Sequence, residues 1–141
     1  MRKYVGFMLS IAYFTISSCT KTCPSGFEGK DCNIESIQKF IGGWAGQELC
    51  GIGNNNYNIQ IGTSLNGPDR MVLYNLYDNG NPELAVTAKI KNTKFTIDSQ
   101  SAGANFWILG SGSVNDNTIT IRYTIGDGLH TDSCTFTGIK Q

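Results

Sequence analysis

The stretch from Gly43 to the last residue is a series of short β-prone runs separated by clusters of Asn, Gly and Pro. The turn signals recur at intervals of about ten residues, a cadence typical of all-β domains. Parallel crossovers need about a dozen residues or more. The links here are shorter, so we expect an antiparallel meander. We predict eight strands, near residues 44–50, 57–62, 70–77, 84–90, 94–98, 106–114, 118–125 and 131–139.

Apolar and polar residues alternate along most of these strands, which predicts one face in a core and the other in water. The clearest case is 118–125, where Arg122 shares the polar face with threonines and the apolar face consists of Ile119, Ile121, Tyr123 and Ile125. The run 70–77 instead carries large apolar residues on both faces. Its outer face is therefore expected to be covered or to form a binding surface.

Four cysteines besides Cys19 define the expected disulfides. They can pair in three ways, and their order suggests Cys23 with Cys32 and Cys50 with Cys134. Cys50 ends the first predicted strand and Cys134 lies in the last, so this bond requires the sheet to curl until its ends meet. We therefore predict an eight-stranded up-and-down barrel or a strongly coiled sheet. Another pairing would favour an open sheet packed on the N-terminal helix. The cysteine spacing does not suit a zinc site, and we predict no metal and no cofactor.

Residues 1–18 have the layout of a secretory signal, in which a basic start, Arg2 and Lys3, precedes an uncharged apolar run over 4–16 and two serines. A membrane-spanning helix needs about 20 apolar residues, so the run is too short for a permanent span. The Ile-Ser-Ser-Cys junction at Cys19 resembles a bacterial lipobox. The resemblance implies cleavage before Cys19 and lipidation of that cysteine. The alternative is an ordinary signal with an incidental cysteine.

Residues 23–32 read Cys-Pro-Ser-Gly-Phe-Glu-Gly-Lys-Asp-Cys, which is similar to the last disulfide loop of an EGF-like module. The resemblance implies a bond between Cys23 and Cys32 and turns with positive φ at Gly26 and Gly29. The upstream cysteines of a complete module are absent. We therefore interpret residues 19–32 as a lipid anchor followed by a stapled spacer.

Residues 33–42 are expected to form a short helix, because Asn33 is a suitable N-cap and three isoleucines, Ile34, Ile37 and Ile41, recur at helical spacing. An extended linker is the alternative. The predicted organisation is a signal at 1–18, an anchor and loop at 19–32, a helix or linker at 33–42, and one β domain at 43–141.

The segment Phe40-Ile41-Gly42-Gly43-Trp44 resembles the F-x-G-x-W motif of lipocalin-like barrels. The resemblance implies that a short helix leads into the first strand and that Trp44 packs across the closed end. The chain departs from the pattern at Arg122, which lies on the seventh predicted strand, whereas the family's tryptophan-covering arginine is on the last. The EGF-like loop followed by G-x-W and E-x-C is also similar to lipoproteins of Bacteroidetes-type bacteria, a likeness that brings no known activity.

Glu48 shares a strand face with Trp44 and Cys50, both of which are expected to point inward. It is therefore either a polar group that orients a ligand in a pocket or a strand-end residue that reaches solvent. We take Trp44, Glu48, Tyr74 and Tyr123 as candidate ligand-binding residues.

The single histidine, His130, lies at a loop end near Asp127 and Asp132. A Ser-His-Asp arrangement would need Ser133, but no nucleophile-turn motif surrounds that serine. We predict that the protein is not an enzyme.

The chain balances eleven basic residues against eleven acidic ones and has no Lys/Arg cluster, which argues against nucleic acid as a partner. We predict a monomeric lipoprotein of the cell envelope, held by its lipid in the outer membrane and facing the periplasm or the cell surface. The lipocalin-like resemblance implies that the barrel binds a small apolar ligand. The alternative is an interaction or inhibitor lipoprotein that uses its outer face or loops and has a filled core.

Overall fold

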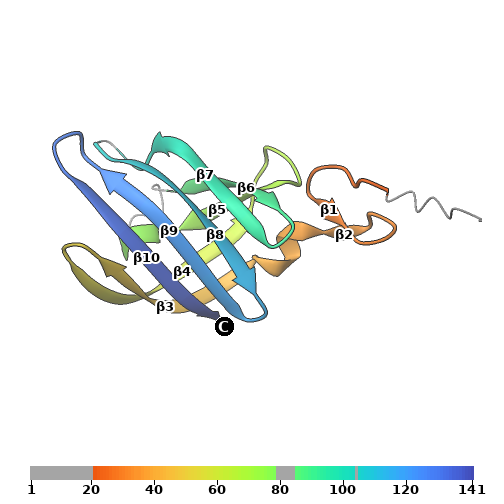
Figure 1. Cartoon of the computed structure of the whole chain (residues 1–141), viewed down its shortest axis with the longest axis horizontal. Coiled ribbons are helices and arrows are strands. Elements are labelled where there is room, and N and C mark those ends of the chain that lie inside the picture. Colours follow the sequence, from red (N-terminus) through yellow and green to blue (C-terminus); the bar gives the residue numbers. More distant parts are fainter. Residues whose placement is uncertain (1–20, 79–84, 104) are drawn as a thin grey trace, which may run out of the picture.

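The computed structural model describes residues 21–78, 85–103 and 105–141. The predicted signal, Cys19 and the expected first residue of the fourth strand, Leu84, lie outside this part of the chain. Eight antiparallel strands form a closed barrel in the order β10-β3-β4-β5-β6-β7-β8-β9, which confirms the predicted fold class (Figure 1). The barrel strands are β3 (Gly42–Cys50), β4 (Gly53–Thr63), β5 (Arg70–Tyr74), β6 (Val86–Lys91), β7 (Lys94–Ser101), β8 (Trp107–Asn115), β9 (Thr118–Gly126) and β10 (Thr131–Lys140).

Two short elements precede the barrel. Strand β1 (Phe27–Glu28) lies in the EGF-like loop of residues 23–32, which the Cys23–Cys32 disulfide closes, and it pairs with β2 (Ile34–Glu35), which follows that loop, in a two-stranded sheet. The 3-10 helix η1 (Ser36–Lys39) follows and leads into β3. No helix within residues 21–78, 85–103 and 105–141 is long and apolar enough to cross a membrane.

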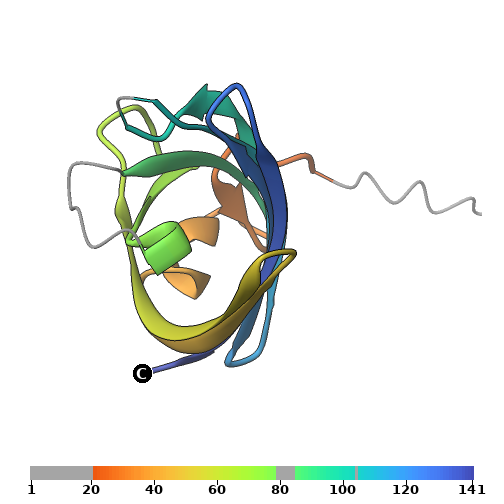
Figure 2. The same ribbon diagram turned by 90° about the vertical axis from the view of Figure 1, so that its left-hand side faces the viewer.

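The barrel has two different ends. At the closed end, η1 and the turns before β5, β7 and β9 gather, and the EGF-like loop extends from this end (Figure 1). At the other end, which we call the mouth, lie the turns after β3, β7 and β9 together with the 3-10 helix η2 (Leu76–Asp78). Figure 2 looks into the barrel from the mouth, with η2 over the opening. The described chain thus starts at the end opposite the mouth.

The closed end is plugged by aromatic side chains. Trp44 and Phe40 are completely buried, and the Trp44 indole N–H donates a 2.8 Å hydrogen bond to the Phe40 carbonyl. Phe40 packs edge-to-face on Phe95 with ring centroids 5.6 Å apart. The ammonium of Lys140, on the last strand, lies 5.4 Å from the centre of the Trp44 ring. The cation over Trp44 is therefore Lys140, while Arg122 is exposed on the outside of β9.

The barrel interior is filled by side chains. Large residues from every strand, including Ile59, Leu73 and Phe136, have almost no exposed surface. The rings of Tyr57 and Phe136 pack at a tilt of 48° with centroids 5.2 Å apart. Glycines make room for the aromatic rings of the interior. A Cβ at Gly112, for example, would collide with the Phe95 ring. The space between the ribbons in Figure 2 is therefore occupied core.

The barrel closes where the first and last strands meet. β10 pairs with β3, and Cys134 stands directly opposite Cys50 in the ladder. Their Cα atoms are 4.2 Å apart and the two sulfurs are bonded. Both predicted disulfides are thus confirmed.

Three local predictions are wrong. Asn33 does not cap the helix, which begins after Glu35 with Ile34 paired in β2. The asparagines after Cys50 are not a link, because β4 starts at Gly53 and backbone pairing with β3 overrides the turn preference of Asn. The strand expected over 70–77 ends at Tyr74, since Tyr77 has a left-handed backbone with φ of 68° and belongs to η2.

Candidate functional site

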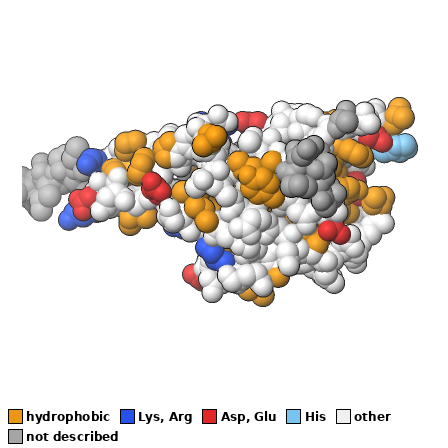
Figure 3. Space-filling model, turned by 180° about the vertical axis from the view of Figure 1, so that it is seen from behind, with side chains coloured by type: hydrophobic (Ala, Val, Ile, Leu, Met, Phe, Trp, Pro, Cys, Tyr) orange, Lys and Arg blue, Asp and Glu red, His pale blue; other side chains and the backbone are white. Residues whose placement is uncertain are grey.

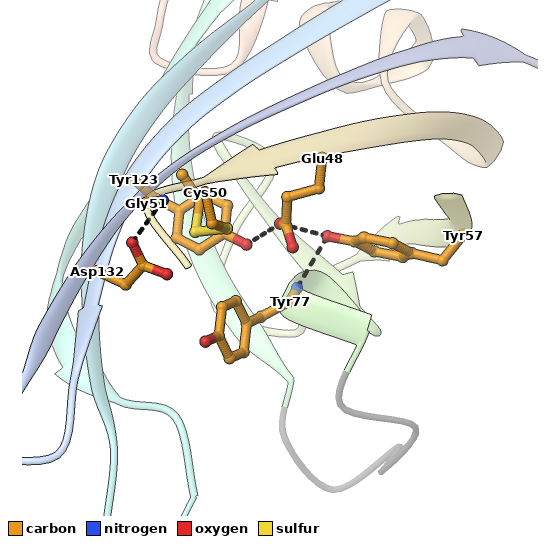
Figure 4. The surroundings of a disulfide bond; sticks show 8 residues. Glu48, Cys50, Gly51, Tyr57, Tyr77, Tyr123 and Asp132 are labelled. Carbon is orange, nitrogen blue, oxygen red and sulfur yellow. Dashed lines mark hydrogen bonds between the residues drawn. A yellow bond between two sulfur atoms is a disulfide. The ribbon is translucent and has the colours of Figure 1, made fainter. Parts of the chain in front are cut away.

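A buried carboxylate lies just inside the mouth. Glu48, on β3, points inward and is 3% exposed. Its Oε1 atom accepts a 2.6 Å hydrogen bond from the Tyr57 hydroxyl of β4 and a second, very short one from the Tyr123 hydroxyl of β9 (Figure 4). Charge-assisted bonds of this kind satisfy a carboxylate that burial would otherwise destabilise. Three strands therefore fix one acidic group at a defined position.

The two tyrosines are held protonated by their surroundings. Burial, reinforced by the adjacent Glu48 carboxylate, raises the pKa of Tyr57 above its usual range. Burial also raises the pKa of Tyr123, and the neighbouring Tyr57 and Glu48 add to the effect. Both hydroxyls therefore remain hydrogen-bond donors to Glu48 at any physiological pH.

Helix η2 is attached to this network. The backbone N–H of Tyr77 donates a 3.0 Å hydrogen bond to the Tyr57 hydroxyl, which places the Tyr77 side chain at the mouth (Figure 4). Burial, followed by the charges of Asp132 and Glu48, raises the pKa of the Tyr77 hydroxyl. This ring is thus close enough to both carboxylates to be influenced by their charge.

Asp132 lies on the rim side of the disulfide. Glu48 is opposite Phe136 in the β3–β10 ladder, two residues inward from Cys50. Asp132 lies two residues outward from Cys134, beyond the end of that ladder, and pairs with Ile125 of β9. Asp132 Oδ1 accepts a 2.8 Å hydrogen bond from the Gly51 N–H, which holds the β3–β4 turn against β10 (Figure 4). The other oxygen, Oδ2, is buried and has no hydrogen-bond partner among the described residues.

A recess of about 310 Å³ opens beside Glu48. It lies between the β3–β4 turn and η2, and its walls include Asn54, Asn55, Tyr77 and Asp78. Asn55 donates a 3.1 Å hydrogen bond to Asp78 and so links the two walls. The recess is thus a small hollow at the barrel rim, lined by polar and apolar side chains alike, with the buried carboxylate as one of its walls.

Glu48 does not form a metal centre with its neighbours. A Glu48 oxygen and the sulfurs of Cys50 and Cys134 lie within 4.8 Å of one another. A thiolate is the form of cysteine that binds metal, and these two sulfurs are consumed by the disulfide. The carboxylate is left to interact with a hydrogen-bond donor or a cation.

The turn between β9 and β10 is organised by Asp127. Its Oδ1 accepts hydrogen bonds from the N–H groups of Leu129 and His130, at 2.9 and 2.7 Å. These two bonds lower the pKa of Asp127. The His130 ring contacts the same carboxylate at 3.7 Å and its side chain is 87% exposed. His130 therefore lies at the tip of a solvated turn, with Leu129 beside it.

The mouth is acidic and carries exposed apolar side chains. Residues 48–57, 75–78, 101–107 and 123–134 include four carboxylates and no Lys or Arg. Ile52 and Leu129, at the tips of two turns, are 81% and 88% exposed, and Phe106 and Leu49 are also exposed. Figure 3 shows hydrophobic side chains and the single histidine at this end. Such a combination of exposed apolar and charged groups is typical of a recognition surface.

The candidate ligand residues from the sequence fall into different places. Glu48 and Tyr123 meet at the mouth. Trp44 is buried in the plug of the closed end. Tyr74 points outward from β5, where its ring lies over Gly62. The structure therefore brings two of the four residues together and separates the others from them.

Sequence reasoning missed Tyr57, Tyr77 and Asp132 as neighbours of Glu48. Tyr57 lies on the strand whose start was misplaced, and Tyr77 was assigned to a strand and not to η2. The register between β3 and β4 is the signal that identifies Tyr57, because it puts Gly46 opposite Tyr57 and Glu48 one step away on the same inner face.

A second hollow lies at the closed end. A groove of about 910 Å³ separates the EGF-like loop from the β6–β7 hairpin. Lys39 bridges part of it through a 2.5 Å ion pair with Glu28. Lysines and carboxylates both line the groove, which lies between the EGF-like loop and the barrel.

Comparison with known protein families finds no match, and no curated protein matches the chain.

Proposed function

We propose that the protein is a lipid-anchored docking module of the cell envelope, held through Cys19 and binding a partner protein with the mouth of its barrel. The observation that carries this proposal is the position of the exposed apolar tips. Ile52 and Leu129 lie at the mouth, the end opposite the EGF-like loop (Figure 1). A tether at the closed end directs the mouth away from the membrane.

The packing of the barrel favours this use over the binding of an apolar ligand inside it. Apolar ligands need an apolar space, and pockets for them measure about 300 to 1,000 Å³. The interior of this barrel is occupied by Phe95, Phe136 and their neighbours. The recess beside Glu48 has carboxylate and amide groups in its walls, so it suits part of a partner protein better than a hydrocarbon molecule.

The anchor rests on the lipobox resemblance of the sequence. One acyl chain holds a protein only marginally, whereas two chains give a stable anchor. A fatty acid analogue fed to the producing cells should label the protein, and Cys19→Ala should remove the label. A label that survives the substitution would contradict the anchor.

The docking surface is tested by photo-cross-linking in intact cells. A photoreactive phenylalanine analogue at Ile52 or Leu129 should yield a discrete adduct with one envelope protein. Leu65 is the matched control, because it is an equally exposed apolar residue on a turn at the closed end. An adduct at Leu65 and none at the mouth, or no adduct anywhere, would contradict the proposal.

A further inference from the structure

The recess beside Glu48 differs from the rest of the surface in its charge. Among the mouth residues defined above, the acidic and basic side chains are four carboxylates and one histidine. The lysines of the hairpins and of the C-terminus lie at the other end, including Lys91, Lys94 and Lys140. Negative charges that line a hollow with low-dielectric walls concentrate the electric field there and attract cations. The ligand of this recess is therefore expected to be positive.

The carboxylate in the recess is positioned before any ligand binds. Tyr57 and Tyr123 both donate to Glu48 Oε1, and the three residues come from three strands of one rigid sheet. A group that is already held in place loses little conformational entropy when it binds. Glu48 is thus built to receive a donor, and the recess wall gives that donor access to it.

Two further groups suit a cation. The Tyr77 ring forms part of the wall, and an ammonium or guanidinium over an aromatic face is stabilised by the ring. Asp78, fixed by Asn55, adds a second carboxylate to the same recess. At the adjacent rim, the buried Asp132 Oδ2 lacks a hydrogen-bond donor within the part of the chain described.

The size of the recess limits what enters it. A volume of about 310 Å³ is at the lower bound for ligand pockets, about 300 Å³, and so suits one side chain. The exposed tips around it, Ile52 above all, give a docked protein apolar contacts at the rim. In many protein interfaces a charged side chain is buried at the centre, and the residues around it contribute less to the binding energy.

We propose that the recess beside Glu48 receives the side chain of a lysine or arginine of the docked partner, with the cationic group facing the Glu48 carboxylate and the Tyr77 ring. This inference rests on the proposed docking function, and it names the chemical class that the mouth recognises. It requires no metal and no covalent step.

The test uses the full-length protein in detergent micelles and four small probes. N-acetyl-arginine amide and N-acetyl-lysine amide carry the cation. N-acetyl-citrulline amide and N-acetyl-norleucine amide are their neutral counterparts. In ¹⁵N NMR titrations the cationic probes should shift the amides of Asn54, Asn55 and Tyr77 in a saturable way, and added salt should weaken the effect. The neutral probes should cause no shift at the same concentrations.

Variants assign the binding to Glu48. Glu48→Gln keeps the shape and the acceptor oxygen but removes the charge, and it should weaken binding of the arginine probe at least tenfold. Asp78→Asn leaves the buried network intact and should weaken binding several-fold. Asp116→Asn is the matched control, since Asp116 is an exposed carboxylate at the closed end with φ of 50°, a conformation that Asn tolerates. This variant should bind like the parent.

Two results would overturn the inference. Neutral probes that bind as tightly as the cationic ones would show that the recess does not select for charge. The second result concerns the variants. If Asp78→Asn binds the arginine probe as well as the parent does, and Glu48→Gln either binds it equally well or misfolds, these carboxylates do not bind the cation. The photo-cross-linking experiment is independent of both, so a docking module without a cation site is distinguishable from a cation site without docking.

Discussion

At the scale of the residue, the Tyr123 hydroxyl is expected to contribute to stability through a single buried hydrogen bond. It is one of two donors to the buried Glu48 carboxylate, the other being Tyr57, and removing a hydrogen bond to a buried charged group costs about 1 to 3 kcal/mol. We predict that Tyr123→Phe lowers the free energy of unfolding by about that amount, measured by urea denaturation. Tyr74→Phe on the outer face is the control and should change it by less than about 0.5 kcal/mol. Equal effects of the two variants would refute the role of the hydrogen bond.

The same tyrosines predict a dependence of stability on alkaline pH. Their pKa values are raised in the folded protein, whereas in the unfolded chain they ionise near 10.0. The unfolded state therefore releases protons that the folded state keeps, so stability is complete below pH 10 and falls as the pH rises above it. Urea midpoints measured on either side of pH 10 should show this fall. In the double variant Tyr57→Phe, Tyr123→Phe the fall should be much smaller, and an unchanged slope would contradict the prediction.

Which residues face inward was predictable at this scale, but their partners were not. Strand parity with Trp44 and Cys50 correctly put Glu48 on the inner face. Parity says nothing about which residue stands opposite on the next strand, because that depends on register and turn length. The β3–β4 turn is shorter than the Asn-rich sequence suggested, so Tyr57 was not recognised as a partner of Glu48.

At the scale of the element, η1 and the start of β3 form the plug of the closed end. Trp44 is fully buried there and bonded to the Phe40 carbonyl. We predict that Trp44→Ala costs about 3 to 5 kcal/mol in urea denaturation, since it removes a large buried side chain. Trp107→Ala is the matched control, because Trp107 is half-buried on the outer face of β8 and should cost clearly less. A comparable loss in both variants would mean that the plug is not a special element.

The EGF-like loop is a second element, which contacts η1 and, at Gly26, the backbone of the β4–β5 turn. The Ser36 N–H donates to the Gly26 carbonyl at 2.8 Å, and Glu28 pairs with Lys39. We predict that Cys23→Ser with Cys32→Ser lowers the Tm by less than about 10 °C, because about 1 to 2 kcal/mol at most is lost in a domain of this size. Thermal melts followed by circular dichroism measure this. A larger decrease would show that the loop is part of the cooperative barrel unit.

Strands were predictable where alternation was strong, as in 118–125, and less so where polar residues or left-handed backbone intervened. β9 was placed within one residue of its observed end. The sequence did not predict η2, because its left-handed residues, such as Tyr77, are set by the tertiary structure around Tyr57 and not by a local pattern. The cation over Trp44 was also missed, since Lys140 reaches that ring only once β10 lies beside β3.

At the scale of the whole molecule, closure of the barrel followed from two cysteines in the first and last strands. The filled interior did not follow from the sequence. Whether a barrel holds a cavity depends on how side-chain volumes interdigitate. Here glycines on the inner face, such as Gly46 and Gly112, admit the rings of Phe136 and Phe95. These pairs become visible only when the register of neighbouring strands is known.

Closure has two contributions, the β3–β10 ladder and the disulfide, and they can be separated. The bond links residues 84 positions apart, and in the chain-entropy description a loop of that length contributes about 4 to 5 kcal/mol. We predict that Cys50→Ala with Cys134→Ala lowers the free energy of unfolding by roughly that amount. Seven residue pairs still join the two strands, so the barrel should stay closed.

Urea denaturation gives the stability of this variant, and hydrogen exchange at Thr135 and Thr137 reports whether the ladder persists. The Cys23→Ser, Cys32→Ser variant is the control, because its bond spans only 9 positions and lies outside the barrel. We expect these amides to stay protected while the free energy of unfolding decreases well beyond the decrease in the control. This result would show that the ladder determines the topology and that the disulfide contributes most of the stability of closure. A loss no greater than the control would mean that the ladder alone keeps the barrel shut.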